Sequence, residues 1–244
     1  MDSCTIGVIL RAAGPLAFKV RDRSVDERPT DECSVRSSRI GRYVGFGSSN
    51  RPGIWCGFND SGLVIVGSTS YIKTQASDLE LINVLYQVEQ EALETSSCVK
   101  EACRLVMDLV SSKAARGLPV GANLLIADRS SAVALEIAGT EYALEFLSAK
   151  PYLMRTNHFS LLSHLNAPRE TNRSSYLRFG RAAAILDQGR GPDDLVKLTR
   201  DHRNGPGENS VCRHGEAFKT VSSVIIDVSR QMRAQYVLNS SPCS

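Results

Sequence analysis

The sequence predicts an α+β protein whose strands and helices pack in layers within one domain. Three observations lead to this prediction. The segments follow the order strands, two helices, strands, two helices, strands; turn signals join neighbouring strands as hairpins; and no regular β-α-β alternation occurs. The chain has 244 residues, of which 42% are hydrophobic and 23% charged, as in ordinary globular proteins. A chain of this length can bury a large core without a disulfide or metal staple.

The N-terminal part of the chain is predicted to be β-structure. Apolar residues 5–10 and 16–20 flank the turn Ala12-Ala13-Gly14-Pro15, which is typical of a hairpin. Residues 22–38 are charged, contain Pro29 and show no clear period, so we expect a loop that flanks the active site. Residues 54–59 and 63–68 flank Asn59-Asp60-Ser61-Gly62, which predicts a second hairpin.

The remaining elements follow from hydrophobic periodicity. Apolar residues recur at helical spacing over 78–93, and a second amphipathic helix is predicted over 98–115, before Gly117 and Pro119. Further helices are predicted over 174–186 and, with a proline near its first turn, over 192–200. Strand patterns cover residues 123–128, 132–138, 142–147, 152–156, 221–228 and 234–238.

Composition and charge exclude several classes of partner. The chain carries 29 basic and 26 acidic residues, for a net charge of +3. This balance gives no electrostatic case for nucleic-acid binding, and Arg36, Arg39 and Arg42 are interpreted as a solvated face. No apolar stretch approaches the roughly 18 residues that span a bilayer, and Met1 to Cys4 do not resemble a secretory signal. We therefore expect a soluble, cytoplasmic protein with no nucleic-acid or membrane partner.

The seven cysteines predict no metal site. Their number is odd, and their positions form neither a C-x-x-C motif nor a block of His and Cys ligands. His158 and His214 have no second ligand nearby in the sequence, so we expect structural roles for both. No metal and no cofactor are predicted, and the thiols are interpreted as small core or surface residues in a reducing compartment.

Cys4 is the most informative residue in the sequence, because it immediately precedes a strand at the start of the chain. If Met1 to Ser3 were removed, one residue would carry both a thiol and a free α-amine. An α-amine has a pKa of about 7.7 to 8.0, so it could take the thiol proton at physiological pH without a catalytic histidine. Considered alone, a near-terminal cysteine is more often incidental.

Other segments add polar groups that suit this chemistry. Asp22 ends the predicted first hairpin, where its carboxylate could hold the amine of residue 4. Asn157 ends a predicted strand, and an Asn side chain is a suitable oxyanion donor. Arg178 lies on a predicted helix, on one face with Ser174 and Ser175. Each residue alone has an ordinary explanation in a loop, a turn or a helix cap.

Taken together, these motifs resemble the N-terminal-nucleophile (Ntn) cysteine hydrolases. The shared set is Cys4-Thr5, a hairpin ending in a cation and Asp22, Gly57-Phe58-Asn59-Asp60-Ser61-Gly62-Leu63, Thr156-Asn157-His158, Ser175 with Arg178, and Cys212-Arg213-His214. The chain is most similar to the acyl-coenzyme A:6-aminopenicillanic-acid acyltransferase-like branch, with choloylglycine hydrolases and penicillin V acylase more distant. The resemblance implies a four-layer αββα sandwich of two mainly antiparallel sheets, formed by residues 4–244 as a single catalytic domain.

The resemblance also implies roles for individual residues. Cys4 matches the nucleophile, Asp22 the acid beside its amine, Asn157 the oxyanion donor and Arg178 the arginine that orders the site. The second oxyanion donor falls on a backbone N-H at Ser68 or Thr69, where bile-salt-type relatives carry Asn. Substrate-binding positions are Lys19, Arg21, Ser68, Thr69 and His158, and whether Lys19 or Arg21 takes the cationic role stays open.

The expected function is therefore an amidohydrolase or acyltransferase that acts through a Cys4 acyl-thioester. The substrate would be a small acyl amide, or an acyl donor such as acyl-CoA or a carrier-bound acyl group; a homo-oligomer is left open. The leader, residues 1–3, would be removed by self-cleavage or by aminopeptidase trimming. Two alternatives remain: a catalytically silent binding or scaffold protein with the same fold, and a papain-like Cys-His enzyme that depends on His158 or His214.

Overall fold

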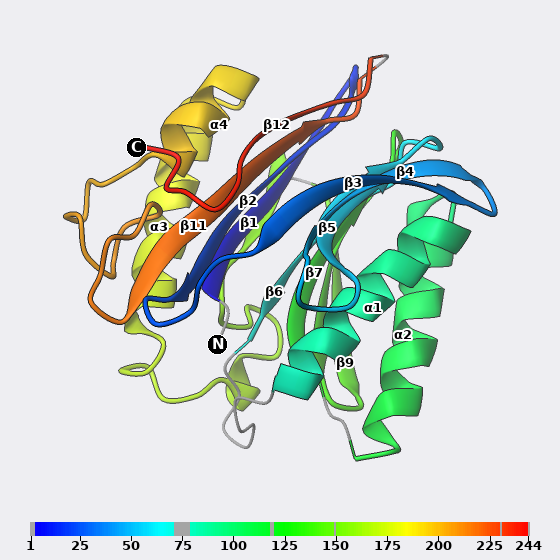
Figure 1. The fold of residues 1–244 in the computed structure, drawn as a ribbon, viewed down its shortest axis with the longest axis horizontal. Coiled ribbons are helices and arrows are strands. Elements are labelled where there is room, and N and C mark those ends of the chain that lie inside the picture. The colour runs from blue at the N-terminus through cyan, green and yellow to red at the C-terminus, as the bar shows by residue number, and fades with distance from the viewer. Residues whose placement is uncertain (1–2, 71–78, 118–119, 149, 230, 244) are drawn as a thin grey trace.

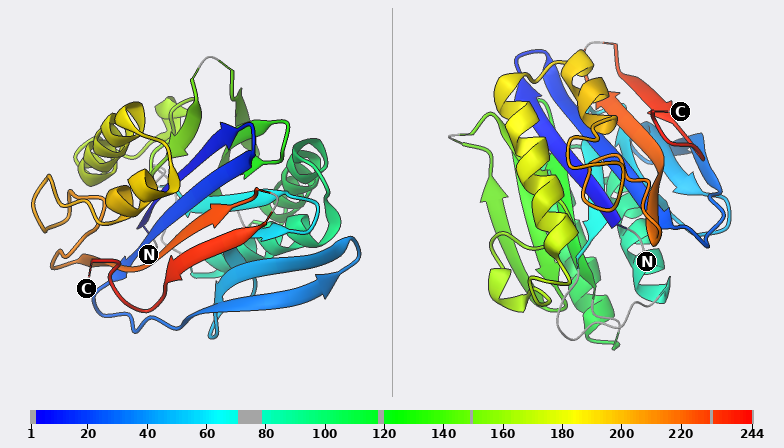
Figure 2. Two further views of the ribbon diagram at one scale, coloured as in Figure 1. Left: turned by 90° about the horizontal axis from the view of Figure 1, so that it is seen from above. Right: turned by 90° about the vertical axis from the view of Figure 1, so that its left-hand side faces the viewer.

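Two antiparallel sheets lie face to face, and helices cover the outer face of each (Figures 1 and 2). We describe a computed structural model, covering residues 3–70, 79–117, 120–148, 150–229 and 231–243. The layers run helices, sheet, sheet, helices, which confirms the predicted α+β four-layer αββα sandwich.

The five-stranded sheet has the order β10-β1-β2-β11-β12, and α3 and α4 cover its outer face. Its strands are β1 (Ser3–Arg11), β2 (Gly14–Ser24), β10 (Tyr152–Arg155), β11 (Phe218–Asp227) and β12 (Arg233–Val237). The helices are α3 (Arg173–Gln188) and α4 (Pro192–Thr199), and a short 3-10 helix spans Ser163–Leu165.

The seven-stranded sheet is a meander in which every strand pairs with its sequence neighbour, from β3 to β9. Its strands are β3 (Asp31–Ser38), β4 (Gly41–Ser48), β5 (Ile54–Asn59), β6 (Val64–Thr69), β7 (Gly121–Ala127), β8 (Ala132–Ala138) and β9 (Glu141–Phe146). The helices α1 (Leu79–Thr95) and α2 (Val99–Ala114) cover its outer face. Because α1 and α2 connect β6 to β7, the helical layer forms within the meander.

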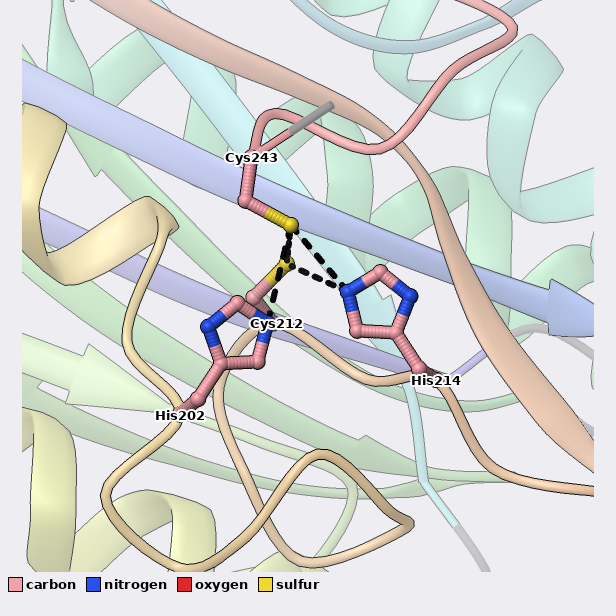
Figure 3. A group of neighbouring side chains, drawn as sticks. All are labelled: His202, Cys212, His214 and Cys243. Carbon is pink, nitrogen blue, oxygen red and sulfur yellow. Dashed lines mark hydrogen bonds between the residues drawn. The ribbon is translucent and has the colours of Figure 1, made fainter.

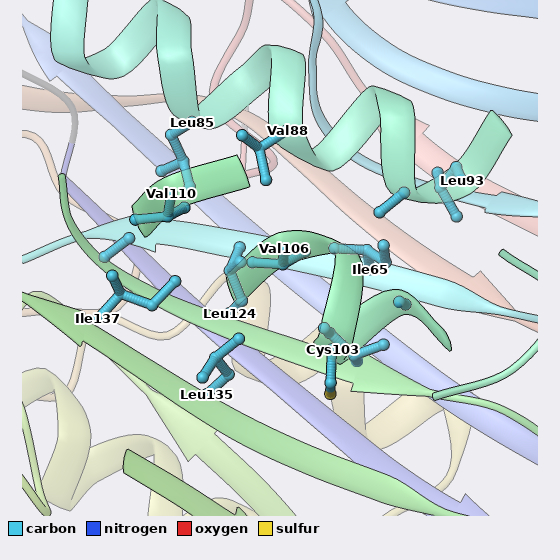
Figure 4. Close-up of a cluster of buried hydrophobic side chains, with 14 of the residues drawn as sticks. Ile65, Leu85, Val88, Leu93, Cys103, Val106, Val110, Leu124, Leu135 and Ile137 are labelled. Carbon is cyan, nitrogen blue, oxygen red and sulfur yellow. The ribbon is translucent and has the colours of Figure 1, made fainter. Parts of the chain in front are cut away.

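Hydrophobic side chains fill all three interfaces between the layers. Figure 4 shows the cluster under α1 and α2, where Leu85, Val106 and Leu124 meet. A second cluster, which includes Cys4, lies between the two sheets, and a third lies under α3 and α4. Each burial of a large apolar side chain contributes about 1.5 to 3 kcal/mol. Among the described residues, none of the helices combines the length and apolarity needed to cross a bilayer.

The predicted hairpins and helices are confirmed, but the predicted loop over residues 22–38 is wrong. Strand β2 continues to Ser24, and Asp31–Ser38 forms β3, which pairs with β4. Most side chains of β3 are exposed or half-buried because β3 is an edge strand. It therefore shows no apolar alternation, and β4 contains three glycines in eight residues, which weakens its strand signal.

Candidate active site

Cys4 lies on β1 in the layer between the two sheets. Its side chain is 1% exposed and belongs to the apolar cluster that contains Trp55 and Cys56 of β5. In the hairpin register Cys4 is opposite Arg21, and Ser3 is opposite Asp22. Side chains alternate across a strand. Cys4 therefore faces the second sheet, whereas Ser3 and Thr5 contact Arg178 of α3.

Three of the four residues predicted for catalysis meet at the backbone of Cys4. The Cys4 N-H donates to Asn157 Oδ1 at 3.1 Å, and its carbonyl accepts from Arg178 Nη1 at 2.9 Å. Arg178 Nη2 also donates to Asn157 Oδ1 at 2.8 Å, so the three residues form one closed network. Arg178 is fully buried, and charge-assisted hydrogen bonds of this kind are the stronger ones in proteins.

Asn157 joins the ends of strands from both sheets. It follows β10, and its backbone N-H donates to Ser175 Oγ on α3 at 2.8 Å. Its side-chain Nδ2 donates to the Thr69 carbonyl at 2.8 Å, and Ser68 Oγ donates to the Thr156 carbonyl at 2.6 Å. The predicted site residues Ser68 and Thr69 of β6 are thereby brought against Asn157.

Asp22 is fully buried opposite Ser3 in the hairpin register. Its Oδ1 accepts from Thr220 Oγ1 at 2.7 Å and its Oδ2 from Arg213 Nη1 at 3.3 Å, with Arg178 Nη1 at 3.9 Å. Burial raises the pKa of Asp22, and the positive charges of Arg213 and Arg178 oppose that rise. Asp22 therefore lies in the same polar network as Arg178.

Ser3 occupies the centre of this network. Its Oγ donates to Asn157 Oδ1 at 2.9 Å and accepts from Arg213 Nη1 at 2.9 Å and Arg178 Nη2 at 3.0 Å. Ser3 is 1% exposed, so its hydroxyl and its peptide bond to Cys4 are held inside the protein. The side chain before the predicted nucleophile thus contacts the same groups as the Cys4 backbone.

Lys19 and Arg21 share the Cys4 side of β2 but have different partners. Lys19 Nζ donates to the carbonyls of Trp55 at 2.9 Å and Gly67 at 2.6 Å, which ties the two sheets together. Arg21 forms a buried ion pair with Asp31, with Nη1 at 2.6 Å and 2.8 Å from the two carboxylate oxygens. Lys19 thus neutralises no carboxylate through these bonds, whereas the charge of Arg21 is balanced by Asp31.

His158 packs against α3 rather than toward Cys4. Its Nδ1 lies 2.8 Å from Ser175 Oγ and 3.1 Å from Thr156 Oγ1, and its ring centroid lies 4.0 Å from that of Tyr176, with the two rings tilted by 36°. Burial, with smaller contributions from Arg178 and a second arginine, lowers the pKa of His158 to about 4. These contacts fit the structural role favoured by its sequence context, and substrate binding by His158 stays a prediction.

Sequence reasoning missed two charged residues near the site. Arg213 binds both Asp22 and Ser3, and the motif Cys212-Arg213-His214 was the signal that could have found it. Glu89 of α1 is fully buried, and burial raises its pKa to about 8 although Lys19 opposes the shift. A carboxylate on the apolar face of a predicted helix, three residues after Tyr86, was the available signal.

The expectation that His214 lacks a nearby ligand is wrong. His214 Nε2 lies 3.1 Å from Cys243 Sγ and 3.7 Å from Cys212 Sγ. The short spacing from Cys212 to His214 was visible in the sequence, but Cys243 is 29 residues farther along the chain and reaches His214 only through folding.

Sequence comparison assigns the family. The family model described as acyl-coenzyme A:6-aminopenicillanic acid acyl-transferase matches residues 14–241. The chain belongs to this family. Family membership identifies it as an enzyme of the acyltransferase type that acts on amide bonds. A comparison with curated proteins gave no match.

This acyltransferase family member is similar to several solved structures. The Caenorhabditis elegans ortholog of N-acylethanolamine-hydrolyzing acid amidase superposes with a TM-score of 0.61 at 13% identity, covering 96% of this chain and 99% of that chain. Penicillin V acylase from Agrobacterium tumefaciens has a TM-score of 0.45 at 12% identity, with 96% and 86% coverage. A variant of conjugated bile acid hydrolase from Clostridium perfringens has 0.46 at 14%, with 95% and 92% coverage. The first likeness establishes the Ntn-hydrolase fold.

Proposed function

We propose that this family member is an N-terminal-cysteine amidohydrolase or acyltransferase that works through a Cys4 acyl-thioester. The observation that carries the proposal is the convergence of Asn157 and Arg178 on the backbone of Cys4, with Asp22 in the same buried network. A cysteine with an incidental role would not require two buried polar side chains from distant parts of the chain to bind its main chain. A cytoplasmic location stays a prediction from the sequence.

The first step is removal of residues 1–3 from the nucleophile. The Cys4 sulfur attacks the Ser3 carbonyl carbon, the Ser3–Cys4 C–N bond breaks, and the nitrogen takes a proton to become the α-amine. Water then hydrolyses the Ser3 thioester, which releases the tripeptide as an acid and restores the thiol. Departure of Ser3 removes one contact from Asn157 Oδ1 and one from the guanidinium of Arg213, both of which now bind the Ser3 hydroxyl. Aminopeptidase trimming would leave the same mature residue.

The mature residue then supplies both nucleophile and base. The α-amine of Cys4 occupies the position of the present N-H, 3.1 Å from Asn157 Oδ1, which orients it. With a pKa of about 7.7 to 8.0 in its unperturbed state, the amine accepts the thiol proton as sulfur attacks the acyl carbon. It later returns that proton to the departing nitrogen.

Asn157 and a backbone N-H at Ser68 or Thr69 form the proposed oxyanion hole. The Asn157 amide nitrogen carries two hydrogens, and the Thr69 carbonyl accepts one of them. The second hydrogen serves the developing oxyanion, and this donor alone is worth about 3 to 4 kcal/mol in the barrier. The contact with Thr69 fixes the amide plane before substrate arrives, so no reorganisation is needed.

The substrate class is a small acyl amide, or an acyl-CoA or carrier-bound donor when the enzyme transfers the acyl group to an amine. Lys19, Arg21, Ser68, Thr69 and His158 are the proposed substrate-binding positions. Water completes a hydrolysis and an acceptor amine completes a transfer. Product analysis with one acyl amide, in the presence and absence of an amine, distinguishes the two outcomes.

The test begins with the intact mass of the untagged protein, which is expected to lack residues 1–3. An activated acyl p-nitrophenyl ester should then add one acyl group to Cys4, visible by mass after acid quenching. Cys4→Ala should abolish acylation and turnover, and the matched control Cys98→Ala, at a half-buried position, should retain both.

Retention of residues 1–3 in a fully active enzyme would overturn the proposal. A folded protein that loses its leader but never forms the acyl adduct would instead be a silent binding protein. Activity that survives in Cys4→Ala but disappears in His158→Gln or His214→Gln would indicate a Cys-His enzyme.

A further inference from the structure

Four potential metal ligands converge at the edge of the five-stranded sheet, beside the active-site network (Figure 3). They form what we term the Cys2His2 cluster: His202, Cys212, His214 and Cys243. One ligand atom from each residue lies within 4.8 Å of all the others. Two soft thiol sulfurs and two imidazole nitrogens are the donor set that proteins use for tetrahedral zinc.

Four of the six donor-to-donor distances in the cluster lie near the edges of a zinc tetrahedron, and the other two are within 4.8 Å. Zn–S bonds of about 2.3 Å and Zn–N bonds of about 2.0 to 2.1 Å place two sulfurs about 3.8 Å apart and sulfur and nitrogen about 3.6 Å apart. Cys212 Sγ lies 3.5 Å from Cys243 Sγ and 3.7 Å from His214 Nε2. Cys243 Sγ lies 3.1 Å from His214 Nε2 and 3.6 Å from His202 Nε2. Small side-chain adjustments would therefore bring the four donors around one ion.

The surrounding backbone fixes the ligands before any ion binds. The loop between α4 and β11 supplies three of them, and the Cys212 N-H donates to the Asp201 carbonyl, next to His202, at 3.1 Å. The His214 N-H donates to the Pro206 carbonyl at 2.8 Å. Cys243 comes from the segment after β12. Cys212 is fully buried whereas His214 and Cys243 are exposed, so an ion can enter from solvent.

We propose that the Cys2His2 cluster binds one structural Zn²⁺ ion with all four coordination positions filled by protein. Both thiols release their protons to solvent on binding, and the two thiolates balance the charge of the ion. Four protein ligands leave no position for a reacting water, so the site is structural. It clamps the segment after β12 onto the loop that carries Arg213.

Zinc at this position would also act on the active-site network. Arg213 lies between the ligands Cys212 and His214, and its guanidinium donates to Asp22 at 3.3 Å and to Ser3 at 2.9 Å. Fixing both neighbours of Arg213 fixes the direction of its side chain. This coupling to catalysis rests on the proposed function, whereas zinc binding does not.

The experiment measures zinc in the full-length chain purified without a histidine tag. One zinc per chain is expected, and zinc removed by a chelator should return on adding Zn²⁺ alone. Cys243→Ser and His214→Gln change exposed ligands, which limits effects on folding. Loss of an outer-shell partner alone costs about 10- to 100-fold in metal affinity, so loss of a direct ligand should weaken zinc binding by more than that.

Two control variants and the spectrum of a cobalt-substituted protein test whether the metal is bound by these four residues. Cys33→Ser and His164→Gln lie outside the cluster and should bind zinc as the unchanged chain does. Co²⁺ substitution should give the absorption of a tetrahedral site with thiolate ligands, and Cys243→Ser should alter it. Absence of tightly bound zinc, equal zinc in Cys243→Ser, or a Cys212–Cys243 disulfide in the freshly purified protein would overturn the inference. Because none of these readouts involves turnover, a failure of the proposed catalysis would leave them unchanged.

Discussion

Replacing Asn157 with Asp separates the two functions that the structure gives this side chain. Asn157 Oδ1 accepts from the Cys4 N-H, Ser3 Oγ and Arg178 Nη2, at 2.8 to 3.1 Å. An Asp carboxylate keeps all three of these contacts. It loses the Nδ2 donor, which now binds the Thr69 carbonyl at 2.8 Å and which we propose for the oxyanion.

The expected cost is large for turnover and modest for folding. Loss of one oxyanion donor lowers kcat by about 10²- to 10³-fold, or about 3 to 4 kcal/mol, because the interaction forms in the transition state. Setting a carboxylate oxygen against the Thr69 carbonyl costs about 1 to 3 kcal/mol of stability, which the added ion pair with Arg178 partly offsets. KM should change little.

The matched control is Asn166→Asp. The Asn166 side chain also binds a backbone: it accepts from the Phe159 N-H at 2.7 Å and donates to the Phe159 carbonyl at 2.9 Å. It has no hydrogen bond to Cys4 or Thr69. Both variants are made in a chain that begins with Met followed by Cys4, so that leader removal does not limit activity. The assays are hydrolysis of an acyl p-nitroanilide and urea unfolding. An Asn157→Asp enzyme with the kcat of the Asn166→Asp control would refute the oxyanion role.

Three further predictions concern stability. Asp31→Asn should lower the free energy of unfolding by about 3 to 5 kcal/mol in urea titrations, because it removes the carboxylate charge of a buried ion pair with Arg21; an unchanged midpoint would contradict this. The unchanged protein should lose stability as pH rises from about 4.5 toward 8, because burial raises the folded-state pKa of Glu89 to about 8. Glu89→Gln should abolish this loss. Parallel stability curves for Glu89→Gln and the unchanged protein would refute that assignment. The unchanged protein should also lose stability as pH falls from about 6.5 toward 4, because the pKa of His158 is depressed to about 4 in the folded state. His158→Gln should abolish this loss. The exposed control His164→Gln should retain that loss.

Local sequence patterns were sufficient for most of the fold. The two early hairpins, the four helices and the later strands follow from period, turn residues and proline position, all of which act over a few residues. The edge strand β3 escaped prediction because most of its side chains are exposed or half-buried, so hydrophobic alternation was not required there. Backbone pairing with β4, rather than an apolar side-chain pattern, makes this segment a strand.

The candidate site could be predicted as a set of residues but not as an arrangement. Resemblance to a family identified Cys4, Asp22, Asn157 and Arg178, and the structure joins them in one buried network. It could not indicate that Ser3 lies at the centre of that network, because its partners are 154 to 210 residues away in the chain. Contacts across such separations depend on which sheet edges meet, and a single sequence carries no local signal for that.

By itself, the sequence determined most of the segments that become strands and helices and which side chains can do nucleophilic chemistry. Only the tertiary structure decided that β6 of one sheet ends against Asn157 beside the other, and that His202 lies next to Cys243, 41 residues farther along. The physical reason is that backbone preference and hydrophobic period are short-range properties. The meeting of distant polar groups is set by how the four layers pack and by the cost of burying those groups without partners.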